Sequence, residues 1–115
     1  KWEVKEIINI EPNDLIMDIG PSTIEKYNHS INKSNTILWN GPLGVYEFTN
    51  FSKGTFTTAL NIAKRNAKKI AGGGSTGEVI KKLDLKNKFS HVSTGGGATL
   101  QFLEGKILPG IVNLL

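Results

Sequence analysis

The sequence predicts an α/β protein in which helices flank a parallel sheet. Short apolar runs alternate with helix-like stretches along the 115 residues, and this alternation is typical of parallel sheets. Two glycine triplets, Gly72-Gly73-Gly74 and Gly95-Gly96-Gly97, each fall where an apolar run gives way to a helix-like stretch. No repeat, low-complexity tract or linker interrupts the pattern, so we expect one domain or part of one.

The first strand is predicted at residues 15–19, a mostly apolar run that ends at the turn Gly20-Pro21. A helix is expected after this turn, with Ser22 as a possible cap. Its apolar residues fall at three- and four-residue spacing, as on one face of a helix: Ile24, Tyr27 and Ile31. Residues 1–13 fit this plan poorly, so we expect them to form a connecting segment.

The second strand is predicted from Thr36 to Trp39 and is broken by the loop Asn40 to Gly44, which is rich in glycine and proline. A helix should begin at Phe51 or Ser52 and end at Arg65. The residues on its core side are expected to be Phe56, Ala59, Leu60 and Ala63.

The rest of the chain repeats this order, with strands predicted at residues 68–71 and 90–93 and helices at 75–83 and 98–103. Strands and helices therefore alternate in a Rossmann-like three-layer arrangement. Right-handed crossovers bring the carboxyl ends of all parallel strands to one edge of the sheet, where ligands of such sheets bind. We expect four turns to converge there: Asp18 to Pro21, Trp39 to Pro42 and the two glycine triplets.

The composition argues against several classes of partner. The net charge of +4 comes almost entirely from lysine, since Arg65 is the single arginine, whereas nucleic-acid readers usually carry arginine forks and stacking aromatics. We therefore expect no nucleic-acid partner, and a solvated basic surface on exposed helix faces, made by Lys64, Lys68, Lys69, Lys81, Lys82, Lys86 and Lys88. No cysteine and no long apolar run is present, so we expect a cytoplasmic protein with no membrane partner.

The glycine triplets suggest a phosphate site. Glycine lets backbone N–H groups turn toward a ligand, and the start of a helix favours an anion by about 0.3–1 kcal/mol per interaction. The alternative is that both triplets are only tight turns between strands and helices. Familiar templates do not fit: the first triplet lacks the lysine of a P-loop, and neither His29 nor His91 has a partner at metal-ligand spacing.

Several segments together resemble phosphoglycerate kinase in their order and spacing. They are Asp18 to Pro21, Trp39 to Glu47, Phe51 to Thr55, Gly72 to Gly74, Ser90 to Ala98, Leu103 to Lys106 and Leu108 to Gly110. The resemblance covers about residues 15–112. It implies the nucleotide half of a two-domain glycolytic kinase that transfers a phosphoryl group between 1,3-bisphosphoglycerate and ADP, giving 3-phosphoglycerate and ATP.

On this resemblance, residues 1–115 form a C-terminal portion of a nucleotide-binding domain. The start of that domain and the substrate domain, which would bind the phosphoglycerate, are then absent. The chain alone should be inactive, and the full-length enzyme should be a monomer. A stand-alone module that binds a nucleotide or another anion without catalysis is the alternative, and a folded but functionally silent piece is a third.

The resemblance also implies roles for individual residues. Asn40 and Gly41 would lie near the phosphates, Val45 would pack on the adenine, and Glu47 would bond the ribose hydroxyls. The nucleotide-binding set is then Asn40, Gly41, Val45, Glu47, Gly72, Gly73, Gly74, Ser75 and Thr76. The groups expected to act in catalysis through their amides are Gly73, Gly74, Gly95, Gly96 and Gly97.

Ser75 departs from the family pattern, which has an aspartate that binds the Mg²⁺ of ADP or ATP. Direct carboxylate support for that metal is then lost, so we expect no metal ligand in this chain. Asp18 is expected to cap its own turn and not to compensate.

Overall fold

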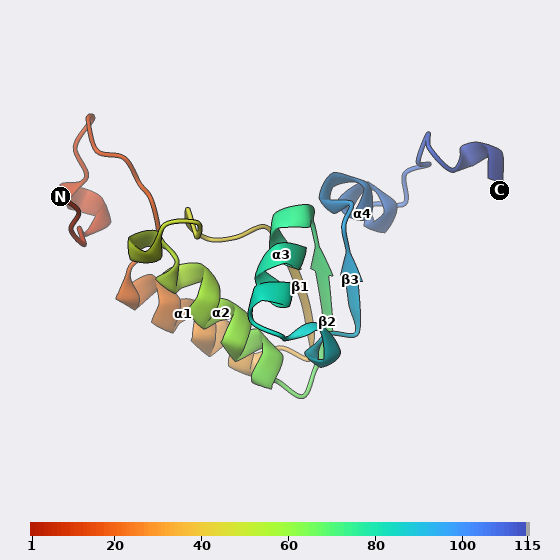
Figure 1. The fold of residues 1–115 in the computed structure, drawn as a ribbon, viewed down its shortest axis with the longest axis horizontal. Coiled ribbons are helices and arrows are strands. Elements are labelled where there is room, and N and C mark those ends of the chain that lie inside the picture. The colour runs from red at the N-terminus through yellow and green to blue at the C-terminus, as the bar shows by residue number, and fades with distance from the viewer. Residues whose placement is uncertain (115) are drawn as a thin grey trace.

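A computed structural model describes residues 1–114 and contains one sheet of three parallel strands (Figure 1). The strands are β1 (Thr36–Asn40), β2 (Lys68–Gly72) and β3 (His91–Ser93), in the order β1-β2-β3. β1 and β2 pair along five residues, from Thr36 with Lys68 to Asn40 with Gly72, and β2 and β3 along three. The strands predicted at 36–39, 68–71 and 90–93 are therefore confirmed.

Four α-helices flank this sheet, which confirms the parallel α/β class. They are α1 (Pro21–Lys33), α2 (Lys53–Lys64), α3 (Gly74–Lys82) and α4 (Gly96–Leu103). Short 3-10 turns are η1 (Ile7–Asn9), η2 (Thr49–Phe51), η3 (Lys86–Lys88) and η4 (Val112–Leu114).

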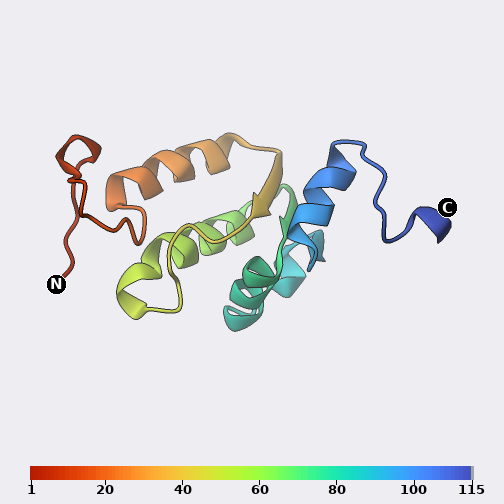
Figure 2. The same cartoon turned by 90° about the horizontal axis from the view of Figure 1, so that it is seen from above.

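The core lies between one face of the sheet and helices α2 and α3. Alternation along β1 turns Ile37 and Trp39 toward these helices, and Val92 of β3 faces α3, 3.9 Å from where a Cβ on Gly77 would stand. The buried apolar residues form one cluster: Ile37, Trp39, Tyr46, Ala59, Ile62, Ala63, Ala71, Val79, Ile80 and Phe89. Helix α1 packs beside α2, as Figure 2 shows. The Asn61 amide of α2 donates a hydrogen bond to Asn28 of α1.

Helix α4 lies on the opposite face of the sheet. Its residues Thr99, Phe102 and Leu103 line a shallow hollow together with Ile70 of β2 and His91 of β3. Beyond α4 this face is open, and Leu38 of β1 is 43% exposed there. Helices therefore lie on both faces of the sheet, but they cover the two faces unequally.

The predicted strand at residues 15–19 is wrong. Leu15 and Ile16 are 83% and 74% exposed, and the segment has no strand beside it within residues 1–114. Its hydrogen bonds go elsewhere: the Met17 carbonyl accepts from the Val45 amide at 2.9 Å, and the Asp18 carboxylate accepts from the Gly54 amide at 2.9 Å. The segment thus crosses the loop after β1 and never joins the sheet.

Two expectations for α1 also need correction. The helix begins two residues earlier than a Ser22 cap requires, because Pro21 occupies its first turn and Gly20 is the capping residue. Ile24 is buried and Ile31 packs against the core, but Tyr27 is 44% exposed. The apolar stripe is narrower than the spacing predicted, because α1 packs mainly against α2.

The core face of α2 is rotated from the predicted one. Ala59 and Ala63 are buried and Phe56 packs against the core, but Leu60 is exposed. Thr55 and Thr58 are buried on the core face instead. The Thr55 hydroxyl accepts a hydrogen bond from the Leu43 amide at 3.1 Å. A buried threonine with a backbone partner is thus compatible with the core, and hydrophobic spacing alone does not reveal it.

Lys69 is buried on β2, although an exposed position was expected. It follows the same alternation as Ala71, which turns it toward the C-terminus of α2. Its Nζ donates hydrogen bonds to the carbonyls of Ala63 at 3.0 Å and Arg65 at 2.7 Å. The lysine thereby satisfies carbonyl groups that the end of α2 leaves free.

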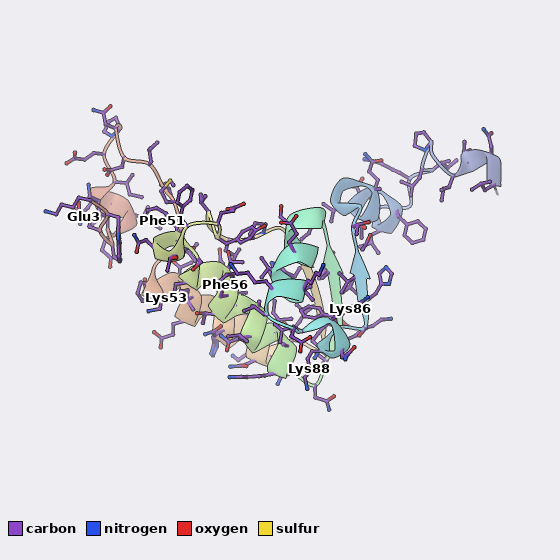
Figure 3. All side chains as sticks on the ribbon, viewed as in Figure 1. Glu3, Phe51, Lys53, Phe56, Lys86 and Lys88 are labelled. Atoms are coloured by element: carbon purple, nitrogen blue, oxygen red, sulfur yellow. The ribbon has the colours of Figure 1, made fainter. Side chains whose placement is uncertain are left out.

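Residues 1–14 form an irregular segment that contains η1 and a turn at Pro12 and Asn13. Trp2 packs edge-on against Phe51 with ring centroids 6.5 Å apart, and Lys5 forms an ion pair with Asp14 at 2.8 Å. Figure 3 shows Glu3 and Phe51 at the same end of the molecule. The Asp14 pKa is lowered by the hydrogen bond from the Glu11 amide and by Lys5.

Candidate functional site

The two glycine triplets meet at the carboxyl edge of the sheet. β1 ends at Asn40, β2 ends at Gly72, and β3 leads through Gly95 into α4. A Cβ on Gly96 would stand 3.0 Å from Gly73 Cα and 3.1 Å from Asn40 Oδ1. A Cβ on Gly72 would stand 2.8 Å from the same Asn40 oxygen. Asn40, Gly72, Gly73 and Gly96 are therefore in close contact, as the convergence of the strands predicts.

Gly73 makes this close approach possible. Its φ of +101° lies in a region that side chains rarely adopt, and its amide donates to the Ser93 carbonyl at 2.9 Å. The hydrogen bond extends the pairing of β2 and β3 by one step beyond the strands. The Gly73 N–H is consequently occupied within the protein and is not free for the amide contact that was expected of this residue.

The amides that remain for a ligand belong to the first turns of α3 and α4. Gly77 is the first α3 residue bonded to a carbonyl one turn back, that of Gly73, and in α4 Thr99 bonds to the Gly95 carbonyl in the same way. The N–H groups before them precede the first helical acceptor. Those at the surface belong to Gly74, Ser75, Gly96, Gly97 and Ala98, whereas Thr76 is completely buried. Both helix starts therefore present amides at the same edge of the sheet.

The loop after β1 is fixed at its beginning by two hydrogen bonds. The Trp39 indole N–H donates to the Gly41 carbonyl at 2.7 Å, and the Gly41 amide donates to the Thr76 hydroxyl at 2.8 Å. Thr76 is completely buried in the first turn of α3. Its hydroxyl thus holds the loop in place, while its predicted contact with a phosphate stays a prediction.

The middle of the same loop is fixed by Tyr46. Its ring is buried in the core, and its hydroxyl donates to Glu78 Oε2 of α3 at 2.8 Å. The Tyr46 pKa is raised, first by this hydrogen bond, then by burial and by the charges of Glu78 and Glu47, while the Ser75 hydroxyl lowers it. Nothing in the sequence signals the pairing, because 32 positions separate the two residues.

Val45 and Glu47 flank Tyr46 in the middle of the loop. Glu47 is exposed and Val45 is half-buried, and the Val45 amide bonds to the Met17 carbonyl. Both side chains therefore belong to a segment that is held by the buried Tyr46 ring and by the backbone bond to Met17. Their predicted contacts with ribose and adenine remain predictions.

Within residues 1–114, no group of three His, Asp or Glu side chains is placed to hold a metal ion. Asp18 does not reach the glycine turns, because its carboxylate accepts from the amides of Ile19 at 2.8 Å and Gly54 at 2.9 Å. It caps the start of α2 as well as its own turn, so the turn from Asp18 to Pro21 is not part of the convergence predicted from the sequence.

Basic side chains gather elsewhere. Lys86 and Lys88 are the first and last residues of η3, which lies at the end of the sheet away from α4 (Figure 3). The carboxyl edge therefore offers an anion backbone amides and not a cluster of lysines. In residues 1–114 no helix is long and apolar enough to cross a membrane.

The fold and this edge define a parallel α/β protein with two glycine-rich turns that meet where strands give way to helices. A sequence model of the phosphoglycerate kinase family matches residues 1–106. The chain belongs to the phosphoglycerate kinase family. The match includes residues 1–13, which fitted the sequence plan poorly.

Similar proteins agree in sequence and in structure. The chain is 53% identical to a phosphoglycerate kinase of Buchnera aphidicola subsp. Schizaphis graminum over 111 residues, which is 96% of this chain and 29% of the relative. It is 49% identical to the enzyme of Dictyoglomus turgidum, over 96% of this chain and 28% of that protein. The structure of phosphoglycerate kinase from Coxiella burnetii matches with a TM-score of 0.86 and 45% identity, over 93% of this chain and 28% of that one. The chain thus spans less than a third of these relatives.

Proposed function

We propose that this chain supplies part of the nucleotide site of a phosphoglycerate kinase. The whole enzyme would transfer a phosphoryl group between 1,3-bisphosphoglycerate and ADP in the cytoplasm, working as a monomer. The three-carbon substrate would be held by a domain beyond these residues. Both relatives named above are phosphoglycerate kinases, and the chain covers 28–29% of their lengths.

The observation that carries the proposal is the meeting of Gly73 and Gly96 beside Asn40. It sets the first turns of α3 and α4 side by side, each with amides that no helical carbonyl uses. Phosphoryl transfer depends mainly on positioning and electrostatic stabilisation, which fixed amides can supply. We assign the phosphates of ADP to the α3 turn and the transferring group to the α4 turn.

The nucleoside would lie against the loop after β1. Val45 would contact the adenine, and the exposed Glu47 carboxylate would accept hydrogen bonds from the ribose hydroxyls. Because Gly41 bonds to Thr76, this loop begins beside the α3 turn. The two parts of one nucleotide would then be bound by two segments that contact each other.

The residues present do not fit a carboxylate-held Mg²⁺. Ser75 offers a neutral hydroxyl at the start of α3, Asp18 is bound to two amides, and Glu78 accepts the Tyr46 hydroxyl. Mg²⁺ in nucleotide sites is usually held by one or two carboxylates together with phosphate oxygens. Binding of ADP by this chain should therefore depend on amides and change little with Mg²⁺.

Calorimetry with the 115-residue chain and ADP tests the proposal. Saturable binding of ADP is expected, together with no turnover in a coupled assay, because the chain lacks any residue shown to hold the three-carbon substrate. Absence of ADP binding would contradict the proposal and favour a silent piece of the enzyme. Binding of inorganic pyrophosphate equal to that of ADP would instead favour a general anion-binding module.

A further inference from the structure

The loop between β1 and α2, residues 41–52, is attached to α3 at its beginning and near its middle. At its beginning the Gly41 amide donates to the Thr76 hydroxyl, and near its middle the Tyr46 hydroxyl donates to Glu78, each at 2.8 Å. Thr76 lies in the first turn of α3 and Glu78 in the second. One helix therefore contributes to the position of the loop at both of these points.

The two attachments differ in what they hold. The Gly41 bond fixes the loop next to Asn40, at the end that faces the glycine turns. The Tyr46 bond fixes the loop next to Glu47, the residue that follows it in the chain. Its donor is 8% exposed and its acceptor belongs to an exposed residue, so the bond joins the core to the rim of the site.

We propose that Tyr46 and Glu78 form a positioning pair, which sets Glu47 and Val45 at a fixed separation from the first turn of α3. The pair makes the protein prefer a nucleoside diphosphate over a bare pyrophosphate. This inference rests on the proposed nucleotide site and adds the residues that align its two parts. Neither Tyr46 nor Glu78 touches the ligand.

Removing the Tyr46 hydroxyl should loosen the middle of the loop, where the Val45 amide still bonds to the Met17 carbonyl, and leave its beginning attached. Tyr46→Phe keeps the buried ring, so the core remains filled, while the bond to Glu78 is lost. The nucleoside end of the site then loses its alignment, and the phosphate end keeps the Gly41 bond. A net hydrogen bond of typical strength corresponds to a change on the order of fivefold in affinity.

The experiment measures the dissociation constants of ADP and of inorganic pyrophosphate by calorimetry. For Tyr46→Phe we expect ADP to bind on the order of fivefold more weakly, with pyrophosphate unchanged. Glu78→Ala should behave in the same way, and the double variant should be no weaker than either single one, because both changes remove one interaction. Glu78→Gln retains an acceptor oxygen and should largely preserve the affinity for ADP.

Tyr27→Phe is the matched control, since Tyr27 is the other of the two tyrosines and lies exposed on α1. Thermal unfolding of each variant shows whether it is folded at the temperature of the titration. Equal weakening of ADP and pyrophosphate by Tyr46→Phe would overturn the inference, because the pair would then only support the fold. Unchanged ADP affinity would overturn it as well. If the unaltered chain binds pyrophosphate but not ADP, the proposed nucleotide site itself fails.

Discussion

The Gly41 amide and the Thr76 hydroxyl are joined by a 2.8 Å hydrogen bond across 35 positions of sequence. It ties the loop after β1 to the first turn of α3, inside the protein. Thr76→Val keeps the shape of the side chain and removes the acceptor, which leaves the Gly41 N–H without its partner. We expect the free energy of unfolding to fall by about 1–3 kcal/mol, measured by urea denaturation. Thr76→Ser retains the hydroxyl, so its free energy of unfolding should fall by less. Equal losses of stability for both variants would contradict this role of Thr76.

Gly96 and Gly97 provide a matched pair of alanine substitutions in α4. A Cβ on Gly96 would stand 3.0 Å from Gly73 Cα, whereas a Cβ on Gly97 would meet nothing within 4 Å. We expect Gly96→Ala to lower the free energy of unfolding by about 1–3 kcal/mol through overpacking. Gly97→Ala should raise it by about 0.4–1 kcal/mol, because alanine restricts the unfolded chain. Thermal or urea unfolding measures both, and a tolerated Gly96→Ala would show that the two turns are not in contact.

Lys69 should make stability depend on alkaline pH. Its pKa is lowered from 10.5 by burial and by the charge of Lys88. The unfolded chain therefore binds more protons than the folded one between the folded pKa and 10.5, so stability rises with pH across that window. Below the window the cost of burying the charge is present in full.

Lys69→Met removes this titration together with the two hydrogen bonds to Ala63 and Arg65. We expect it to lower the free energy of unfolding by about 1 kcal/mol at pH 7. The advantage of the unaltered chain should grow as the pH rises toward 10. Lys68→Met, on the exposed side of the same strand, is the control and should change neither quantity. If the difference in free energy of unfolding between Lys69→Met and the unaltered chain stays constant with pH, the pKa of Lys69 is not lowered by folding.

Glu47 should contribute to binding and not to stability. Its side chain is exposed, and if it accepts hydrogen bonds from the ribose, Glu47→Ala should weaken ADP binding by about 1–2 kcal/mol. Binding of inorganic pyrophosphate should not change. Glu25→Ala on α1 controls for the loss of a surface charge. Calorimetry that finds the same ADP affinity for Glu47→Ala would remove this residue from the site.

Ser75→Asp tests whether the first turn of α3 can recruit a metal. A carboxylate there would add the ligand that Mg²⁺ prefers, next to the amides of the same turn. We expect ADP affinity to become dependent on Mg²⁺ in the variant, by on the order of tenfold or about 1.4 kcal/mol. In the unaltered chain the same titration should have little effect. Identical Mg²⁺ dependence of the two proteins would mean that the metal is bound elsewhere or not at all.

Local patterns predicted the sheet because its strands are short apolar runs bounded by turns. Thr36 to Trp39 and Lys68 to Ala71 each differ from the observed strand by one residue at the C-terminal end. The segment Leu15 to Ile19 has a similar composition, and yet it forms no strand. Apolar composition does not show whether a neighbouring strand is available, and here Val45 and Gly54 bond to Met17 and Asp18 instead.

The candidate site was predictable where topology alone brings residues together. Asn40, Gly72, Gly73 and Gly96 follow strands that end at one edge, so their contact follows from parallel pairing. Tyr46 with Glu78 and Lys69 with Ala63 are contacts between elements whose relative rotation is set by packing, and no local pattern encodes that rotation. For Lys69 one signal was present, because strand alternation places it on the same side as Ala71.

The short pairing of β3 makes β3 and α4 easier to open than β1 and β2. β3 pairs with β2 along three residues, and α4 contributes no buried residue to the core. Local unfolding of β3 and α4 should therefore cost less than global unfolding, and their amides should exchange with deuterium before those of β1 and β2. A ligand that touches both glycine turns has to hold this unit closed, so part of its binding free energy is used to order the chain, and its measured affinity is lower by that amount.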